Sequence, residues 1–234
     1  MFLHKKLSGH PGLTRMVPFV AVVLLTACQG KMGVTSTYWL YFAKTLIGLG
    51  LLLALKPLMQ EIRWAFSWEA VLVGAAVFAV WVGVSGEWTT QSSLWIKLGL
   101  AKAPTMLTPA WNPNEQFGTG SALACFFIAV RILGSALVIP PLEEVFYRSF
   151  LYRYVAKQDF LTVPMNKFLP IPFLVTAAIF GLAHNEWLAG IFCGAAYQWL
   201  VIRKGRLGDS MTAHAVTNFL LGVWVVWRSA WHFW

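Results

Sequence analysis

Seven apolar runs recur along this chain, and they constrain its fold more than any other feature. They cover residues 16–28, 38–55, 70–84, 121–140, 171–184, 187–202 and 211–227. Only 12% of the 234 residues are charged, whereas soluble domains carry roughly 25%, so little charge is left for a wetted surface. In a bilayer such runs satisfy their backbone groups as helices. The expected fold class is therefore all-α: a polytopic membrane helix bundle of about seven to eight helices.

The expected organisation has three parts. Residues 1–16 form a basic tail with Lys5, Lys6 and Arg15, residues 17–120 hold the N-terminal transmembrane helices and a long loop, and residues 121–234 hold the remaining helices. Because basic segments stay on the cytoplasmic side, the tail and the basic segment 203–206 are both expected to be cytoplasmic. Six apolar runs lie between them, and an even number of crossings agrees with that orientation.

Two segments leave alternatives open. The first run ends in Leu-Thr-Ala-Cys28, which resembles a bacterial lipoprotein signal, but more apolar runs follow it. A first membrane helix is therefore the favoured interpretation. Residues 142–157 are rich in charge, and we expect a buried or cytoplasm-facing helix there, after a break at Pro140-Pro141.

Other classes of protein are less compatible with the composition. The formal net charge is +9, but the basic residues are spread along the chain and no polar domain carries them, so no nucleic-acid partner is expected. The three cysteines, Cys28, Cys125 and Cys193, are far apart and lie in or beside apolar runs. They are expected to be small buried hydrophobic residues, without disulfides or metal-ligand spacing.

Glu143 and Glu144 directly follow the double proline and form the first polar cluster. Glu144 and Arg148 are four residues apart on one helical face and are expected to pair. Glu143, in the expected first turn, is then influenced by the helix N-terminus and by the low dielectric. Such a carboxyl group suits a general base. The alternative is a structural acid that closes a helix cap.

Two further clusters follow on the next apolar helices. His184 ends one of them, where it is either a catalytic group or a hydrogen-bond donor between helices. His214 and Asn218 are four residues apart, which places both side chains on one face, about 6 Å apart along the axis. Two neutral donors in this arrangement can hold one oxyanion. Because burying each polar group costs free energy, a shared polar site is favoured over scattered structural roles.

These residues carry a resemblance to a known family. The ordered motifs EExxxR (Glu143, Glu144, Arg148), FxxxH (Phe180, His184) and HxxxN (His214, Asn218) resemble those of the CAAX-protease and bacteriocin-processing membrane family. Its eukaryotic members are the type II CAAX prenyl endopeptidases. The resemblance implies that residues 121–234 form a CAAX-protease-like catalytic helical core.

A narrower resemblance rests on three more segments. Residues 140–151, 187–190 and 232–234 are similar to the CAAX-protease-related proteins of bacterial exosortase systems. This similarity implies a multi-pass protein of a bacterial inner membrane, with a functional link to an exosortase and protein sorting.

The family resemblance implies an intramembrane endopeptidase that hydrolyses a peptide bond of a membrane-associated or lipidated protein. In this mechanism, Glu143 takes a proton from a water held between it and His184. The resulting hydroxide attacks the scissile carbonyl, His214 and Asn218 stabilise the oxyanion, and Glu143 returns the proton to the leaving amine. No cofactor is required.

The other motif residues have supporting roles in this mechanism. Glu144 with Arg148 would orient its helix and the terminal carboxylate of the substrate, and Phe180 completes the second motif.

Two alternatives stay open. Glu143, His184 and His214 could be zinc ligands that leave one position for water; chelator-resistant activity would decide between the two mechanisms. The chain could also be a non-catalytic membrane chaperone, immunity or scaffold protein with the same fold. Transport is not expected, because the charged residues gather instead of following a pathway.

Overall fold

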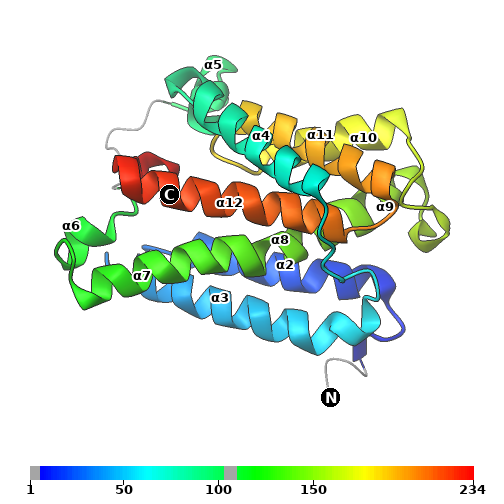
Figure 1. Cartoon of the computed structure of the whole chain (residues 1–234), viewed down its shortest axis with the longest axis horizontal. Coiled ribbons are helices and arrows are strands. Elements are labelled where there is room, and N and C mark those ends of the chain that lie inside the picture. Colours follow the sequence, from blue (N-terminus) through cyan, green and yellow to red (C-terminus); the bar gives the residue numbers. More distant parts are fainter. Residues whose placement is uncertain (1–5, 103–109) are drawn as a thin grey trace. The chain divides into compact units, whose positions relative to one another are not determined.

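Helices make up the regular structure of this protein (Figure 1). The computed structural model describes residues 6–102 and 110–234, and within this part of the chain no strand occurs. The predicted all-α class is confirmed. Lys5 of the expected basic tail lies outside the described residues.

The chain divides into two compact units. Unit 1 comprises Met1–Arg63, Ala110–Phe146 and Asn218–Trp234, and unit 2 comprises Trp64–Pro109 and Tyr147–Thr217. The proposed motif residues are shared between them: Glu143, Glu144 and Asn218 belong to unit 1, and Arg148, Phe180, His184 and His214 belong to unit 2.

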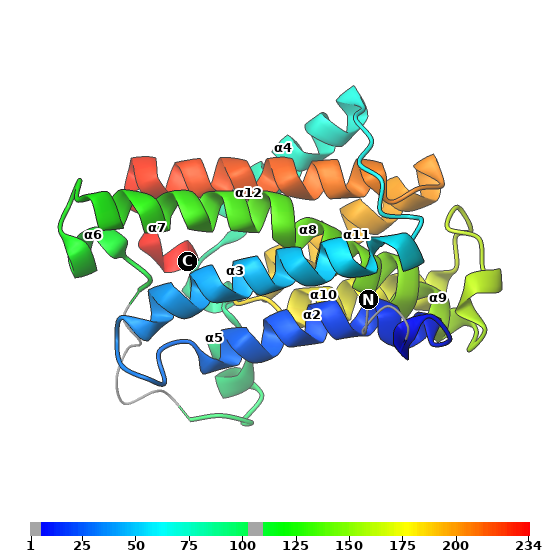
Figure 2. The same ribbon diagram turned by 90° about the horizontal axis from the view of Figure 1, so that it is seen from below.

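Unit 1 is built around long apolar helices. Its helices are α2 (Pro11–Cys28), α3 (Ser36–Leu55), α6 (Pro113–Phe117), α7 (Ala122–Leu133), α8 (Ile139–Glu144) and the second part of α12 (Gly208–Arg228). Helices α2 and α3 lie side by side in both views (Figures 1 and 2). A Cβ on Gly48 would lie 3.2 Å from side-chain atoms of Val22 and Leu142, so this glycine allows close packing among α2, α3 and α8.

Helix α2 begins earlier than the sequence predicts. It starts at Pro11 rather than at Met16, and Arg15 lies inside it with 5% of its surface exposed. The guanidinium bonds to Glu61, with 2.7 Å between Nη2 and Oε1. Because this ion pair and the backbone of α2 hold Arg15, it belongs to the packed helix and not to a free tail.

The basic residues within apolar helices of unit 1 have neighbours that accommodate them, as expected from the cost of burying a charge. Lys44 Nζ donates to Thr26 Oγ1 at 2.9 Å and lies 4.3 Å from the Tyr41 ring centre. The Arg131 guanidinium lies over the rings of Trp111 and Tyr41, at 4.5 and 4.7 Å. Both cationic groups therefore have partners within unit 1.

The predicted break at Pro140-Pro141 is wrong. A single helical segment runs from Ala122 to Ala156, with π-helical turns at Gly134–Val138 and Val145–Leu151 on either side of the prolines. A proline normally clashes with the carbonyl four residues earlier, which for Pro140 is that of Ala136. Since that carbonyl lies in the wider π turn, the helix accommodates the prolines without ending.

Unit 2 surrounds an antiparallel helical hairpin. Its helices are α4 (Trp68–Val84), α5 (Gln91–Lys97), α9 (Tyr152–Ala156), α10 (Pro170–Leu182), α11 (Trp187–Lys204) and the first part of α12. Small residues let α10 and α11 approach closely. A Cβ on Gly190 would lie 2.8 Å from Gly181 Cα, and a Cβ on Gly194 would lie 3.1 Å from Ala177 Cα.

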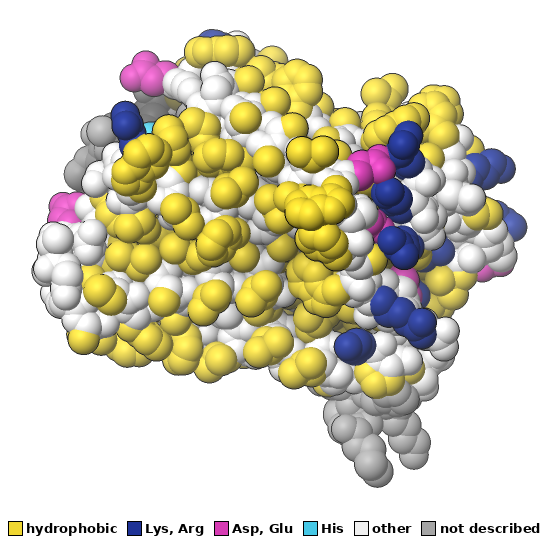
Figure 3. Space-filling view, viewed as in Figure 1, with side chains coloured by type: hydrophobic (Ala, Val, Ile, Leu, Met, Phe, Trp, Pro, Cys, Tyr) yellow, Lys and Arg dark blue, Asp and Glu magenta, His cyan; other side chains and the backbone are white. Residues whose placement is uncertain are grey.

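Four helical segments are long and apolar enough to cross a membrane. They are Pro11–Cys28, Ser36–Leu58, Ala122–Ala156 and Gly208–Arg228, and α4 and α10 are shorter apolar helices. On the face in Figure 3, hydrophobic side chains are spread over much of the surface, and most of the Lys and Arg side chains lie toward the right of the view. These features describe a multi-pass membrane protein.

The predicted burial of the cysteines holds only in part. Cys193 is buried in α11, whereas Cys28 and Cys125 are exposed. Both exposed cysteines lie on candidate spans, where an apolar side chain can face lipid as well as protein. Their burial therefore could not be inferred from an apolar neighbourhood alone.

Candidate functional site

The Phe180 ring is the centre of the polar residues of unit 2. It is fully buried, and the rings of His184 and His214 lie 4.5 and 6.1 Å from it, centre to centre. The Arg148 guanidinium lies over the same ring at 4.5 Å. With Tyr197, which stacks on His214, these residues form what we name the Phe180 cluster. Unit 2 thus brings together its residues from all three motifs.

His184 has a defined orientation at the end of α10. Its Nδ1 lies 2.7 Å from the backbone oxygen of Phe180. Because a carbonyl only accepts, Nδ1 carries the proton, and in the neutral ring Nε2 is then a hydrogen-bond acceptor. The Trp81 ring packs edge-on at 5.6 Å. His184 is therefore prepared to accept a hydrogen bond from water at Nε2.

The turn that carries His184 is held by the segment that follows α4. The Gln91 side chain donates to the carbonyl of Leu182, and the Gln91 backbone donates to the carbonyl of Asn185. Two residues beyond His184, buried Glu186 accepts from Thr89 Oγ1 at 3.0 Å. These bonds satisfy polar groups at the end of α10 and limit movement of the histidine.

His214 lies on α12 in the interior of unit 2, with 3% of its surface exposed. The Tyr197 ring stacks on it at 4.9 Å, and the Tyr197 hydroxyl donates to Thr217 Oγ1 at 2.7 Å. Thr217 in turn donates to the carbonyl of Gly74 at 2.8 Å. A network from α11, α12 and α4 therefore fixes the ring that faces His214.

Arg148 is the fully buried cation of the cluster. Its Nη2 donates to the backbone oxygen of Gly194 at 3.3 Å, and its guanidinium also lies within 5.8 Å of the Tyr197 ring centre. A buried guanidinium needs such partners, because its desolvation is costly. Arg148 thus contacts both α10 and α11 within unit 2.

In unit 1, Glu143 and Glu144 lie in α8, where Glu143 is half-buried and Glu144 is fully buried. The Lys44 ammonium interacts electrostatically with the Glu143 carboxylate. Asn218 Nδ2 donates to the backbone oxygen of Ser135 at 2.8 Å. Ser135 lies in the π turn before the double proline, so this turn supplies the acceptor that orients Asn218.

The predicted position of Glu143 in a first helical turn is wrong. Because the helix continues through Pro140-Pro141, Glu143 lies in its interior. Neither the influence of a helix N-terminus nor a cap at that point accounts for this residue. Its surroundings come from its place between two π turns and from Lys44.

Sequence reasoning missed several polar residues of this region. Tyr197 and Thr217 support His214, and Lys44 approaches Glu143. Gln198 is fully buried on α11, and neither polar atom of its amide has a hydrogen-bond partner among the described residues. The available signal was a polar residue within an apolar run, which is costly to bury in a membrane helix.

The charged end of α11 lies outside the four candidate spans. Glu69 accepts from Lys204 Nζ at 2.7 Å and pairs with Arg203 Nε at 2.5 Å. The hydrogen bond from Lys204 is the main reason why the pKa of the Glu69 carboxyl lies below its usual value. This group belongs to the surface of unit 2 and not to the Phe180 cluster.

A metal centre was the alternative predicted for Glu143, His184 and His214. Over residues 6–102 and 110–234, no group of three or more His, Cys, Asp or Glu side chains is arranged to hold a metal ion. Zinc at Glu143, His184 and His214 stays a prediction, as the alternative to the metal-free reaction.

Comparison with known proteins bears on the C-terminal half of the chain. No curated protein and no solved structure gives a significant match. Residues 124–220, less than half of the chain, match the family model described as Type II CAAX prenyl endopeptidase Rce1-like. That stretch contains all three motifs. The match supports the family resemblance and a membrane-protease activity of the CAAX type.

Proposed function

We propose that the protein is an intramembrane endopeptidase that hydrolyses a peptide bond with a water activated by Glu143. The observation that carries this proposal is the Phe180 cluster, in which His184 and His214 contact one buried ring. The family match over residues 124–220 supports the same class of reaction. The sequence motifs add Glu143 and Asn218, which belong to unit 1, to the proposed catalytic residues.

The first step is attack by water. Nε2 of His184 accepts one hydrogen of the water, as its Nδ1–H bond to Phe180 permits. The Glu143 carboxylate takes the other proton, and the hydroxide oxygen forms a bond to the scissile carbonyl carbon. General base catalysis of this kind contributes about 10²–10⁴-fold.

The second step is stabilisation and collapse of the tetrahedral intermediate. His214 and Asn218 lie four residues apart on α12 and donate to the oxyanion. The Asn218 amide has two N–H groups, so its bond to Ser135 orients the group while leaving it a second donor. The C–N bond then breaks, and Glu143 delivers its proton to the leaving amine.

The proposed substrate is a membrane-associated or lipidated protein. The apolar helices around the motifs favour a substrate segment that is itself apolar. Glu144 with Arg148 would orient the substrate's terminal carboxylate. On the narrower sequence resemblance we further propose a bacterial inner-membrane location and a link to exosortase-dependent sorting. The basic residues of the tail support a cytoplasmic N-terminus.

The test is a comparison of protein C-termini in cells that express the wild-type chain, Glu143→Gln or Glu115→Gln. Glu115 is an exposed carboxylate of unit 1 outside the motifs, so it is the matched control. We expect a set of C-termini that is present with wild type and Glu115→Gln and absent with Glu143→Gln. Chelator treatment of metal-stripped, purified protein should leave cleavage unchanged.

The outcome that contradicts hydrolysis is equally specific. If folded Glu143→Gln protein produces the same C-termini as wild type and fully complements a deletion strain, the chain acts as a chaperone, immunity or scaffold protein. If a chelator abolishes cleavage and zinc restores it, the metal-free mechanism fails while the endopeptidase activity stands.

A further inference from the structure

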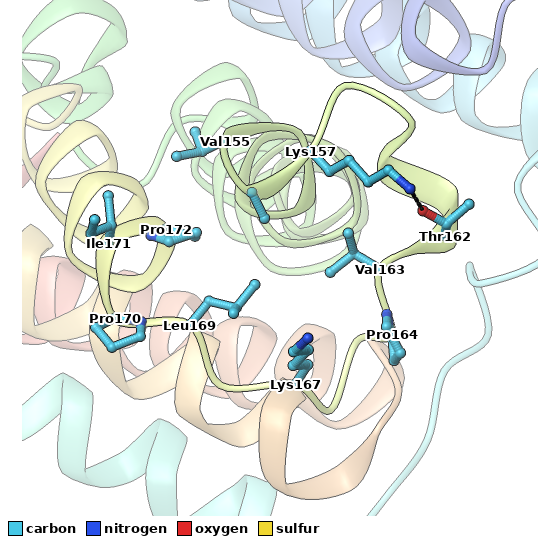
Figure 4. Close-up of a pocket in the computed structure, with 11 residues that line it drawn as sticks. Val155, Lys157, Thr162, Val163, Pro164, Lys167, Leu169, Pro170, Ile171 and Pro172 are labelled. Atoms are coloured by element: carbon cyan, nitrogen blue, oxygen red, sulfur yellow. Dashed lines mark hydrogen bonds between the residues drawn. The ribbon is translucent and has the colours of Figure 1, made fainter.

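A cavity of about 570 Å³ lies in unit 2, apart from the Phe180 cluster. The end of α9, the following loop and the start of α10 surround it (Figure 4). Helix α10 has 13 residues and spans roughly 18 Å along its axis, with the cavity at its first residue and His184 beyond its last. The cavity is therefore a separate feature from the proposed hydrolytic site.

The lining combines positive charge with apolar surface. Lys157, directly after α9, and Lys167, shortly before α10, both line the cavity (Figure 4). No Asp or Glu is found among the described residues that line it. Lys157 Nζ donates to Thr162 Oγ1 at 3.2 Å. Val163 and Leu169 provide apolar walls. This charge balance favours an anionic ligand that also carries apolar groups.

The rim of the cavity has the character of a membrane boundary. Ile171, which lines the cavity, is 71% exposed, and Phe168 and Leu174, close to the lining residues in sequence, are 50% and 67% exposed. The basic segment 203–206 is adjacent, because a Cβ on Gly205 would lie 3.7 Å from the Cβ of Asn166. Lysines beside exposed apolar residues are typical of the level of lipid headgroups.

We propose that this cavity binds an anionic phospholipid, with its headgroup phosphate between Lys157 and Lys167 and its glycerol and first methylenes against Val163, Leu169 and Ile171. Basic pockets at the cytoplasmic side of membrane helices bind such headgroups, and the adjacent segment 203–206 carries the charge expected on that side. An acidic peptide would satisfy the lysines but would not require the apolar rim.

Native mass spectrometry of the full chain in detergent tests the proposal, with phosphatidylglycerol and phosphatidylcholine as probes. Wild type is expected to bind phosphatidylglycerol more tightly. The variant Lys157→Gln/Lys167→Gln should bind it about 25-fold more weakly, since each basic side chain contributes about fivefold. The matched control Lys97→Gln/Lys102→Gln removes two exposed lysines of unit 2 outside the cavity and should leave binding unchanged.

A second variant tests whether binding also depends on the volume of the cavity, with its charge unchanged. Ala156→Trp adds a large side chain to an exposed position of the cavity wall and keeps both lysines, so it should also weaken phosphatidylglycerol binding. Equal binding of the two lipids by wild type would overturn the proposal, as would unchanged binding by the lysine variant. Displacement of phosphatidylglycerol by an equal concentration of glycerol phosphate would assign the cavity to a soluble phosphate instead.

Discussion

Unit 2 holds cationic side chains in two contrasting settings. In the Phe180 cluster, Arg148 is fully buried and is held by a backbone carbonyl and aromatic rings. Beside the cavity, Lys157 and Lys167 are exposed on a loop between α9 and α10. A buried charge persists only with fixed partners, so it determines position, whereas exposed amines remain available to a ligand from outside. The first region is suited to chemistry and the second to recognition.

The largest expected difference between the two regions is in cleavage. Glu143→Gln should lower the rate of peptide cleavage by about 10²–10⁴-fold, because the general base is lost. Lys157→Gln/Lys167→Gln should leave the rate in detergent unchanged. Purified variants assayed with a peptide that carries an apolar segment would measure both. An equal loss of cleavage rate in the two variants would contradict the assignment of chemistry to one region and of ligand recognition to the other.

The next difference is in stability. Phe180→Ala should lower the free energy of unfolding by about 3–5 kcal/mol, since it empties the centre of the cluster. Phe168→Ala, at a half-exposed ring near the cavity, should change it by about 0.5 kcal/mol or less. Denaturant titration in detergent compares them. Similar losses of stability in the two variants would show that the Phe180 ring does not hold the Phe180 cluster together.

A smaller effect is expected for the hydrogen bonds that support His214. Thr217→Val removes the acceptor of the Tyr197 hydroxyl and the donor to Gly74. Leaving these buried groups unsatisfied should cost about 1–3 kcal/mol. Thr162→Val, which loses an exposed bond from Lys157, is the control, and thermal unfolding is the measurement. If Thr162→Val destabilised the protein as much as Thr217→Val, the claim that the hydrogen bonds of Thr217 hold the Tyr197 ring in place would be contradicted.

The smallest expected effect concerns Glu69 at the charged end of α11. Because its pKa is lowered in the folded state, the contribution of its ionised form to stability is present above the ordinary glutamate pKa of about 4.3 and is lost as the pH falls below it. Glu69→Gln should therefore lower the melting temperature slightly at pH 7. The difference in melting temperature between Glu69→Gln and wild type should disappear at pH 3. If the difference instead grew as the pH fell, the ion pairs of Glu69 would not be its cause.

The sequence predicted the helices of this protein well, and its failures have physical causes. The apolar runs located the long helices of the described residues. Within a bilayer, the backbone N–H and C=O groups of an apolar segment must hydrogen-bond to one another, and a helix allows this. The double proline was taken as a break because proline lacks a donor. The π turns that accommodate it involve packing of Gly134 against Thr45 of α3, and no local pattern reveals such a contact.

The candidate site was predictable in residue type and less so in environment. The motifs selected Phe180, His184 and His214, which the structure brings into contact. Tyr197 and Lys44 were not selected, because a tyrosine or lysine in an apolar run gives no sign of which neighbour it meets. The tautomer of His184 also required the structure, since it depends on a 2.7 Å approach to a backbone oxygen.

Cysteine crosslinking between residue 143 and the two histidine positions tests the central claim most directly. In a chain whose three cysteines are replaced, Glu143→Cys would be combined with His184→Cys or His214→Cys. The control pair would be Ile171→Cys with His184→Cys, which lie at opposite ends of α10. A single water bound by Glu143 and His184 requires a short thiol crosslinker to join the first pair in the folded protein and to leave the control pair unjoined. Absence of any crosslink from position 143 to either histidine position would contradict hydrolysis by these residues.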